Sequence, residues 1–253
     1  MRIILNIDKS IEQNAGIYFD RAKKAKLKAI GATDALKKSQ KILKRTKKKQ
    51  DAIKETIKIK REKKWYEKFR WFFSSEEFLV IGGRDATSND IIIKKYAEKE
   101  DIVFHTDMAG SPFFVIKSGG KKITEKTLKE TACATAIYSR AWKKGLATTE
   151  VFYVTPEQVT KKANSGESLS KGAFMIYGKT TYLENNMKLA IGILDGVTIG
   201  GPLDAIKSQT KYYVRITQGD KKTSNVAKMI KKKIGGELDD IIRFLPAGGV
   251  NFK

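Results

Sequence analysis

The first 70 residues of the chain are strongly basic and contain no proline. They hold 23 Lys and Arg against 8 Asp and Glu, a net charge of +15, whereas residues 71–253 carry a net charge of +8. A segment with this much like charge repels itself unless it is solvated or lies against a polyanion. It is therefore either a helix with a solvated lysine-rich face or a surface that binds nucleic acid, and we favour the second interpretation. An acidic membrane surface is the weakest alternative, because no bulky apolar face accompanies the lysines.

The same segment predicts a long helix that begins after Ser10. Ser10 and Gln13 match a capping box, and the apolar positions that follow repeat in steps of four and three, as in a coiled coil. These positions are Ile11, Ala15, Tyr18, Ala22, Ala25, Ala29, Ala32 and Leu36. Two geometries fit: a continuous rod to about Arg70, ~90 Å long, or a helical hairpin with residues 44–49 at its tip. The alanine seam needs a partner helix, either within a hairpin, from a second copy in a homodimer, or from a segment upstream of this sequence.

Aromatic residues and cations alternate where the arm is expected to end. The rings are Trp65, Tyr66, Phe69, Trp71, Phe72 and Phe73, and Lys64, Lys68 and Arg70 lie among them. Such a mixture is typical of surfaces that stack bases and hold phosphates. The spacing also suits rings that anchor the arm to a globular body, and we favour that interpretation.

Short apolar runs separated by close turns predict strands in the rest of the chain, at residues 78–81, 101–105, 113–117, 151–155, 173–177, 180–183, 189–194 and 212–217. Helices are not regularly interposed between these runs. The pattern therefore indicates an α+β fold with a largely antiparallel sheet and flanking helices, preceded by the long basic coiled-coil arm. Three parts are expected: the arm at 1–70, an α+β domain at 71–195 and a small C-terminal α+β extension at 196–253.

Cysteine and histidine are too scarce for several classes of protein. One cysteine excludes a disulfide scaffold or a zinc ribbon supplied by this chain alone. One histidine excludes every His-pair metal motif, so neither a metal nor a cofactor is expected. No apolar run approaches the ~20 residues that span a bilayer, and the first residues lack the apolar stretch of a signal peptide. We therefore expect no membrane contact and a cytoplasmic setting. We also expect Cys133 to be a small core residue rather than a nucleophile.

Several basic or polar motifs are candidate RNA contacts. The Gly-Gly-Arg-Asp sequence at 82–85 follows a strand and precedes a helix, so its backbone N–H groups could cradle a phosphate beside Arg84 and Asp85. A tight turn fits these residues equally well. A polar, glycine-punctuated loop follows at residues 163–172. The lysines in and beside that loop are further candidates: Lys161, Lys162 and Lys171. The densest basic run of the arm supplies the others: Lys44, Arg45, Lys47, Lys48 and Lys49.

His105 and Asp107 are the sharpest local feature. Residues two apart on a strand share a face, so the imidazole and the carboxylate could lie side by side as an oriented general base. A hydrogen-bonded pair that ties a strand end is the alternative, and we favour it. No catalytic residue is therefore expected, although a structural or RNA-contacting role remains open for both.

Several of these motifs resemble the RNA-binding domain of the NFACT family. The resemblance rests on WYEKFRWFFSS at 65–75, FLVIGGRD at 78–85, Asn89 and Asp90, DIVFHTD at 101–107 and SGESLSKGAFMI at 165–176. NAGIYF at 14–19, with its lysine-rich continuation, is similar to the middle coiled coil of the family. The tail, with Gly-Gly-Pro at 200–202 and RFLPAG at 243–248, resembles an archaeal-type extension.

The resemblance implies a ribosome quality-control factor. Such proteins bind the large ribosomal subunit with tRNA, act in rescue of stalled ribosomes and support C-terminal tailing of the stalled peptide. The amino-terminal domain of the family has no counterpart in this sequence, so the chain is expected to be the C-terminal part of a longer protein or a shortened relative. Two other functions stay open: an RNA-processing enzyme that uses His105 and Asp107, and a structural coiled-coil adaptor. We expect an RNA- and ribosome-binding module that is not an enzyme.

Overall fold

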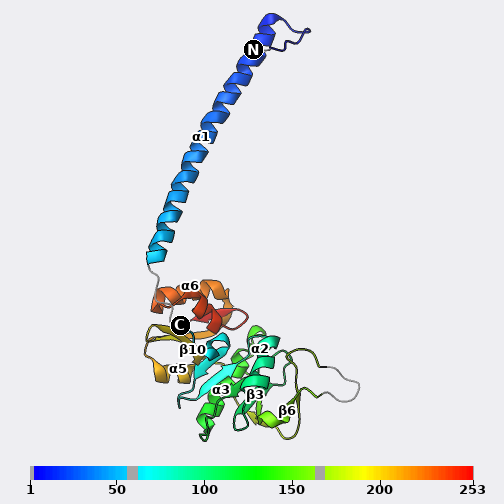
Figure 1. Cartoon of the computed structure of the whole chain (residues 1–253), viewed down its shortest axis with the longest axis vertical. Helices are drawn as coiled ribbons and strands as arrows, with labels where there is room; N and C mark the ends of the chain where they lie inside the picture. The colour runs from blue at the N-terminus through cyan, green and yellow to red at the C-terminus, as the bar shows by residue number, and fades with distance from the viewer. Residues whose placement is uncertain (1–2, 56–61, 163–168, 253) are drawn as a thin grey trace. The chain divides into compact units, whose positions relative to one another are not determined.

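The computed structural model describes the backbone of residues 3–55, 62–162 and 169–252, together with the side chains of these ranges other than 44–55. The chain divides into two compact units, Met1–Glu62 and Lys63–Lys253. We call the first the arm and the second the body (Figure 1). The arm ends at Glu62 rather than near Arg70, because Arg70 is already the first residue of a strand in the body.

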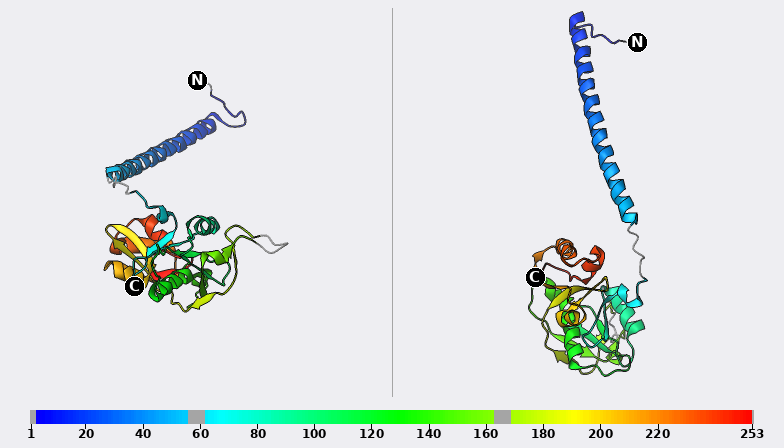
Figure 2. Two further views of the ribbon diagram at one scale, coloured as in Figure 1. Left: turned by 60° about the horizontal axis from the view of Figure 1, so that its bottom comes forward. Right: turned by 90° about the vertical axis from the view of Figure 1, so that its left-hand side faces the viewer.

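One helix, α1 (Ile11–Glu55), makes up most of the arm and is uninterrupted in every view of Figures 1 and 2. Ser10 caps it as predicted: its Oγ accepts from the N–H of Gln13 at 3.2 Å, and Gln13 Oε1 accepts from the N–H of Ser10 at 3.1 Å. Because the helix runs through residues 44–49 without a break, the hairpin with its tip there is wrong. The rod is confirmed as far as Glu55, a length of about 70 Å.

The described residues before α1, from Ile3 to Ser10, lie along its first turns. The Asn14 side chain is buried; it accepts from the N–H of Asn6 at 2.9 Å and donates to the carbonyl of Lys9 at 3.1 Å. The Tyr18 hydroxyl donates to the carbonyl of Ile4 at 2.7 Å. Side chains of the helix therefore satisfy this backbone, and the described part of the arm offers it no second strand.

The body contains two antiparallel sheets and a short ladder. The first sheet has the order β1-β2-β4-β3-β5-β8 and the second β10-β9-β11-β12, while β6 pairs with β7. All these pairings are antiparallel, which confirms the predicted α+β class. The strands of the first sheet are β1 (Arg70–Phe73), β2 (Leu79–Gly82), β3 (Ile102–Thr106), β4 (Phe114–Ile116), β5 (Val151–Val154) and β8 (Thr181–Leu183). The others are β6 (Val159–Thr160), β7 (Met175–Ile176), β9 (Leu189–Leu194), β10 (Val197–Pro202), β11 (Tyr213–Lys221) and β12 (Val250–Phe252).

Helices flank both sheets. The helix α3 (Glu125–Ile137) touches β3, β4 and β5 of the first sheet and β10 of the second, so it joins them. In the second sheet, α5 (Leu203–Gln209) contacts β9, β10 and β11, α6 (Thr223–Ile234) contacts β11 and β12, and α7 (Leu238–Phe244) contacts β10. The remaining helical turns are η1 (Trp65–Lys68), α2 (Ala86–Ile91), η2 (Ile92–Tyr96), α4 (Arg140–Lys143) and η3 (Pro156–Gln158).

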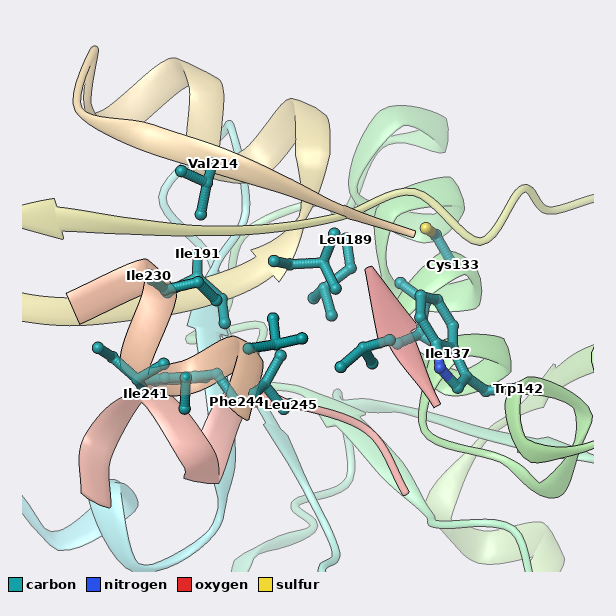
Figure 3. Packing of buried hydrophobic residues seen from close by; sticks show 14 residues of the cluster. Cys133, Ile137, Trp142, Leu189, Ile191, Val214, Ile230, Ile241, Phe244 and Leu245 are labelled. Atoms are coloured by element: carbon teal, nitrogen blue, oxygen red, sulfur yellow. The ribbon is translucent and has the colours of Figure 1, made fainter. Parts of the chain in front are cut away.

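A shared core joins the two sheets, so the structure does not separate residues 196–253 from the rest of the body. Ile137 and Trp142, from α3 and α4, pack in one cluster with Leu189, Ile241 and Phe244 (Figure 3). The boundary expected at 195/196 falls in the tight turn between β9 and β10, which pair along their whole length. The composition of the tail suggested a separate unit, but its apolar residues face a core that α3 completes. Cys133 is buried in the same cluster, as expected, and burial raises the pKa of its thiol to about 12.

The alanine seam generates the first prediction. Ala22, Ala25 and Ala29 are exposed, and the described residues provide no helix that covers them. We expect Ala25→Leu to change the free energy of unfolding of the monomeric chain by less than about 0.5 kcal/mol, because both residues favour helices and nothing is displaced. Ala136→Leu is the matched control: Ala136 is fully buried on α3, so overpacking should cost ~1–3 kcal/mol.

Chemical denaturation of both variants, with sedimentation to follow association, makes the comparison. A large loss of stability or of self-association in Ala25→Leu would show instead that the seam is packed against another helix in solution.

Candidate nucleic-acid interface

A pocket of about 430 Å³ lies on the body at the turn between β2 and α2. Its walls come from Arg70 on β1, from residues 83–86 of the turn, from residues 109–113 between β3 and β4, and from residues 170–174 before β7. The pocket therefore brings together four predicted site residues from distant parts of the sequence: Arg84, Asp85, His105 and Lys171. The remaining predicted residues of the body, Asp107, Lys161 and Lys162, do not line it.

The Gly-Gly-Arg-Asp sequence forms a tight turn and does not offer a phosphate cradle. The N–H of Gly83 donates to the carbonyl of Phe113 at 2.9 Å, and those of Arg84 and Asp85 both donate to Ser88 Oγ, at 2.7 and 2.9 Å. Asp85 Oδ1 in turn accepts from the N–H of Ser88 at 2.7 Å, and this hydrogen bond lowers the pKa of the carboxyl group. Asp85 is thus the cap of α2, and the cradle interpretation is wrong.

Asn89 holds two walls of the pocket together. Its Oδ1 accepts from the buried N–H of Phe113 at 3.2 Å. A Cβ atom on Gly83 would overlap this same oxygen, so glycine is required where the turn passes Asn89. No local pattern indicates this role of Asn89, because its partner lies 24 residues away.

Asp90 holds the wall formed by residues 170–174 in place. Its Oδ1 accepts from the N–H of Gly172 at 3.0 Å and lies 3.1 Å from the Nζ of Lys161, and Lys94 lies 3.6 Å from its Oδ2. The Lys161 ammonium also donates to the carbonyl of Ser170 at 3.1 Å and lies 4.4 Å from the centre of the Phe174 ring. Lys161, predicted as a phosphate contact, is therefore committed to holding the loop in place.

Lys162 and Lys171 are both exposed, and Lys171 faces the pocket. Neither has an ion-pair partner among the described residues. The arm residues Lys44, Arg45, Lys47, Lys48 and Lys49 lie on α1, but their side chains are outside the described set. Phosphate contact by these seven residues stays a prediction.

His105 and Asp107 do not bond to each other. The imidazole stacks on Phe113, with ring centres 4.2 Å apart, and its Nε2 lies 3.2 Å from the carbonyl oxygen of Ser111. Asp107 lies beyond the end of β3 and accepts from the Tyr182 hydroxyl at 3.1 Å. Burial lowers the pKa of His105, against the hydrogen bond to Ser111, so the ring is neutral at physiological pH. Each residue therefore ties a different loop, and the expected hydrogen-bonded pair is wrong in its geometry.

Arg70 is the pocket residue that sequence reasoning missed. Its guanidinium carbon lies 3.9 Å from the centre of the Tyr138 ring, and its Nη1 donates to the carbonyl of Arg243 at 3.2 Å. Burial lowers the pKa of Arg70, and the charge of Arg84 acts in the same direction. No carboxylate in the described chain pairs with Arg70 or Arg84. The alternation of cations and rings at 64–73 was the available signal, but it did not show which cation faces a pocket.

Most of the aromatic cluster is core, although one ring is not. Tyr66, Phe69 and Phe72 are buried in the body, so they pack inside it rather than stacking bases. Trp65 is 45% exposed and stacks on Tyr96, with ring centres 4.6 Å apart and planes 5° apart. Lys68 donates to the Tyr96 hydroxyl at 2.7 Å. The exposed Trp65 ring and the half-buried Tyr96 ring beside this cation have the chemistry of a base-stacking surface.

Neither a membrane span nor a metal cluster occurs in the described part of the chain. In the ranges 3–55, 62–162 and 169–252 no helix is both long and apolar enough to cross a membrane. The same residues hold no cluster of three or more His, Cys, Asp and Glu side chains able to bind a metal ion.

Comparison with known proteins assigns this part of the body to a class. Residues 68–178 match the NFACT protein RNA binding domain. This range contains Arg70, Arg84, His105 and Lys171, and with them every wall of the pocket. The body is thus built around an RNA-binding domain.

Relatives extend the match beyond that domain. The chain is 45% identical over 201 residues to the archaeal Rqc2 homolog aRqcH of Methanocaldococcus jannaschii, an alignment that covers 76% of the chain and 30% of that protein. It is 41% identical over 177 residues to the NEMF homolog of Drosophila melanogaster, a ribosome quality control complex subunit, covering 67% of the chain and 17% of that protein. The chain is 39% identical over 175 residues to human NEMF, an alignment that covers 67% of the chain and 16% of that protein. The chain belongs to the NFACT family, and it spans less than a third of the length of these relatives.

The buried imidazole generates the second prediction. An unfolded histidine has a pKa of about 6.5, and burial lowers that of His105. The stability contributed by neutral His105 is therefore fully present above pH 6.5 and declines as the pH falls toward the lower folded pKa. This is the single histidine of the chain, so the unfolding free energy of the wild type should fall relative to that of His105→Gln between pH 7 and 5.5. A difference that stays constant or grows on acidification would contradict the assignment.

The third prediction concerns Gly83 in the turn between β2 and α2. Gly83→Ala should destabilise the body by ~1–3 kcal/mol, because the added methyl displaces Asn89 and with it the acceptor of the Phe113 N–H. Gly31→Ala, on α1 with open space around it, is the matched control and should be neutral or stabilising by up to ~1 kcal/mol. Urea denaturation of the two variants tests both expectations. Equal stabilities would show that Asn89 does not require glycine at position 83.

Proposed function

We propose that the chain is the RNA- and ribosome-binding module of a ribosome quality-control factor. The observation that carries the proposal is the match of residues 68–178 to the NFACT RNA-binding domain, with a cationic pocket inside the matched range. The relatives that share the largest part of the chain are named as ribosome quality control subunits or their archaeal homolog.

The electrostatics support RNA as the partner. The chain carries a net charge of +23, and no carboxylate in its described part pairs with Arg70 or Arg84. Cations that lie against phosphate release condensed counterions, and this release is the main sequence-independent source of affinity for nucleic acid. The arm, residues 1–62, carries a net charge of +12, about half of the total, and most of it lies on α1.

Within this proposal the partners are the rRNA of the large ribosomal subunit and tRNA, in the cytoplasm. The module would hold the factor on a subunit that carries a stalled peptide and so support rescue of the ribosome and C-terminal tailing. The chain spans less than a third of the length of these relatives, and within the proposal this part contributes the contact with RNA.

We further propose that the chain acts by binding and not as an enzyme. An RNA-processing site would need an activated base, and His105 bonds to a carbonyl while Asp107 bonds to Tyr182. A general base must reach the proton that it removes, and these two side chains bond to different partners rather than to each other. This arrangement supports a binding role. Multiple-turnover RNA cleavage that disappears on His105→Ala would overturn this part of the proposal.

The fourth prediction tests RNA binding and the role of the arm. We expect binding of the chain to structured RNA to weaken steeply with salt. Replacing Lys44, Arg45, Lys47, Lys48 and Lys49 together with Gln should flatten the plot of log K against log salt by about 0.7–0.9 for each phosphate that the arm no longer neutralises. The control replaces five exposed lysines of the body with Gln: Lys207, Lys211, Lys222, Lys228 and Lys232.

Fluorescence anisotropy over a salt series gives the slopes, and circular dichroism checks that α1 is retained. A larger drop in slope for the arm variant than for its control supports the proposal. If both variants keep the wild-type slope, residues 44–49 are only a solvated face. If the wild type binds RNA without salt dependence, or not at all, the proposed function fails.

A further inference from the structure

We propose that the pocket at the β2–α2 turn holds a single unpaired nucleotide, whose phosphate is bound by Arg70, Arg84 and Lys171 and whose base lies against the half-buried side chains of Phe174 and Ile176. The inference rests on the proposed function, because it names the kind of RNA that the body selects. The family match assigns RNA binding to a range of residues and says nothing of a pocket or of unpaired nucleotides.

The charge of the pocket favours an anionic ligand. Three cationic side chains line the pocket, and the carboxylate beside them, Asp85, is engaged by Ser88. Arg70 is partly buried and held by the Tyr138 ring and the Arg243 carbonyl. A desolvated cation without an acidic partner is costly unless a ligand supplies the anion. The guanidinium fork also matches the oxygens of a phosphate, with which it forms charge-assisted hydrogen bonds.

Arg140 adds a positive charge beside a lining residue. A Cβ built on Gly110 would come within 2.9 Å of the Arg140 guanidinium, so this group lies against Gly110. Arg140 has no ion-pair partner among the described residues. Three cations line the pocket and Asp85 is the carboxylate in its lining, so an anionic ligand is favoured.

The concave shape of the pocket favours an unpaired nucleotide. At about 430 Å³, the pocket is within the range of concave sites that enclose a small organic ligand. A base that is stacked and paired in a duplex cannot enter such a concavity, whereas a nucleotide splayed out of a loop or bulge can. The pocket therefore admits an unpaired nucleotide and excludes a paired one. The cations that bind phosphate could not make this distinction alone, because paired and unpaired RNA both carry phosphates.

Apolar side chains line another part of the pocket. Phe174 and Ile176 are half-buried there. Phe113 is buried, with the Phe174 ring edge-on to it at 5.4 Å and the His105 ring stacked on it. Aromatic walls bind the faces of bases with little sequence preference. The wall is also held in place before any ligand binds, because Asp90 ties Gly172 and Lys161 to α2. Such preorganisation lowers the entropic cost of binding.

The fifth prediction compares two probes: an RNA hairpin with an unpaired loop, and the same stem closed as a blunt duplex. Arg84→Gln with Lys171→Gln removes two exposed charges from the pocket without touching the core. Lys228→Gln with Lys232→Gln removes two exposed charges from α6 and is the matched control. Dissociation constants of wild type and both variants are measured for each probe at one ionic strength.

We expect the wild type to prefer the hairpin. The pocket variant should bind the hairpin about tenfold or more weakly and the duplex almost as well as before, because charge-assisted hydrogen bonds to one phosphate are removed. The control should weaken both probes by the same modest factor. Phe174→Ala, which removes part of the aromatic wall and no charge, should also lower affinity for the hairpin alone.

Equal losses for both probes in the pocket variant, or no loss at all, would overturn the nucleotide pocket while RNA binding stands. A wild type that binds hairpin and duplex equally well would also overturn it. Failure of the wild type to bind either probe would instead defeat the proposed function, so the two failures can be told apart.

Discussion

The short helix α2 and its cap hold the pocket together. Asp85 closes the turn on Ser88, Asn89 accepts the N–H of Phe113 from the β3–β4 segment, and Asp90 receives both Lys161 and the N–H of Gly172. Three polar side chains within six residues thus fix three walls that come from separate parts of the body. Backbone groups that were unpaired in those loops would cost ~1–3 kcal/mol each, so the arrangement stabilises the fold and shapes the site at once.

These internal bonds also determine which positive charges are available to a ligand. Lys161 is committed to Asp90, and the N–H groups of the Gly-Gly-Arg-Asp turn are committed to Ser88 and Phe113. Arg70, Arg84 and Lys171 have no such commitment to a carboxylate in the described chain. The site is therefore smaller and more defined than the overall charge of +23 suggests, and the proposed recognition of RNA by the body rests on a few residues around one turn.

The two sheets of the body share α3 and its core, and this explains why the tail is not an independent part. Ile137 and Trp142 complete a cluster whose other members come from α6, α7 and the second sheet. The position of Arg70 depends on the same union, since the carbonyl that receives its Nη1 belongs to Arg243 near the end of α7. A residue of the tail thus helps to place a cation in the pocket of the RNA-binding domain.

The sequence by itself determined the features that depend on a few neighbouring residues. The cap at Ser10 was enough for the start of the helix α1, and short apolar runs with close turns were enough for an antiparallel α+β body. The structure decided that α1 continues through residues 44–49 instead of turning back as a hairpin. Charge counting pointed to a polyanion, and the motifs at 65–107 pointed to the family. Only the tertiary structure decided that Arg70 lines the pocket, that Lys161 serves Asp90 and that His105 and Asp107 bond to different partners. The partners of these side chains lie from 6 residues away, in the case of Ser111, to 173 away, in the case of Arg243. Local patterns encode helices, strands and caps because those form over one or two turns, whereas a pocket forms where distant segments meet, and no local pattern records which segments they are.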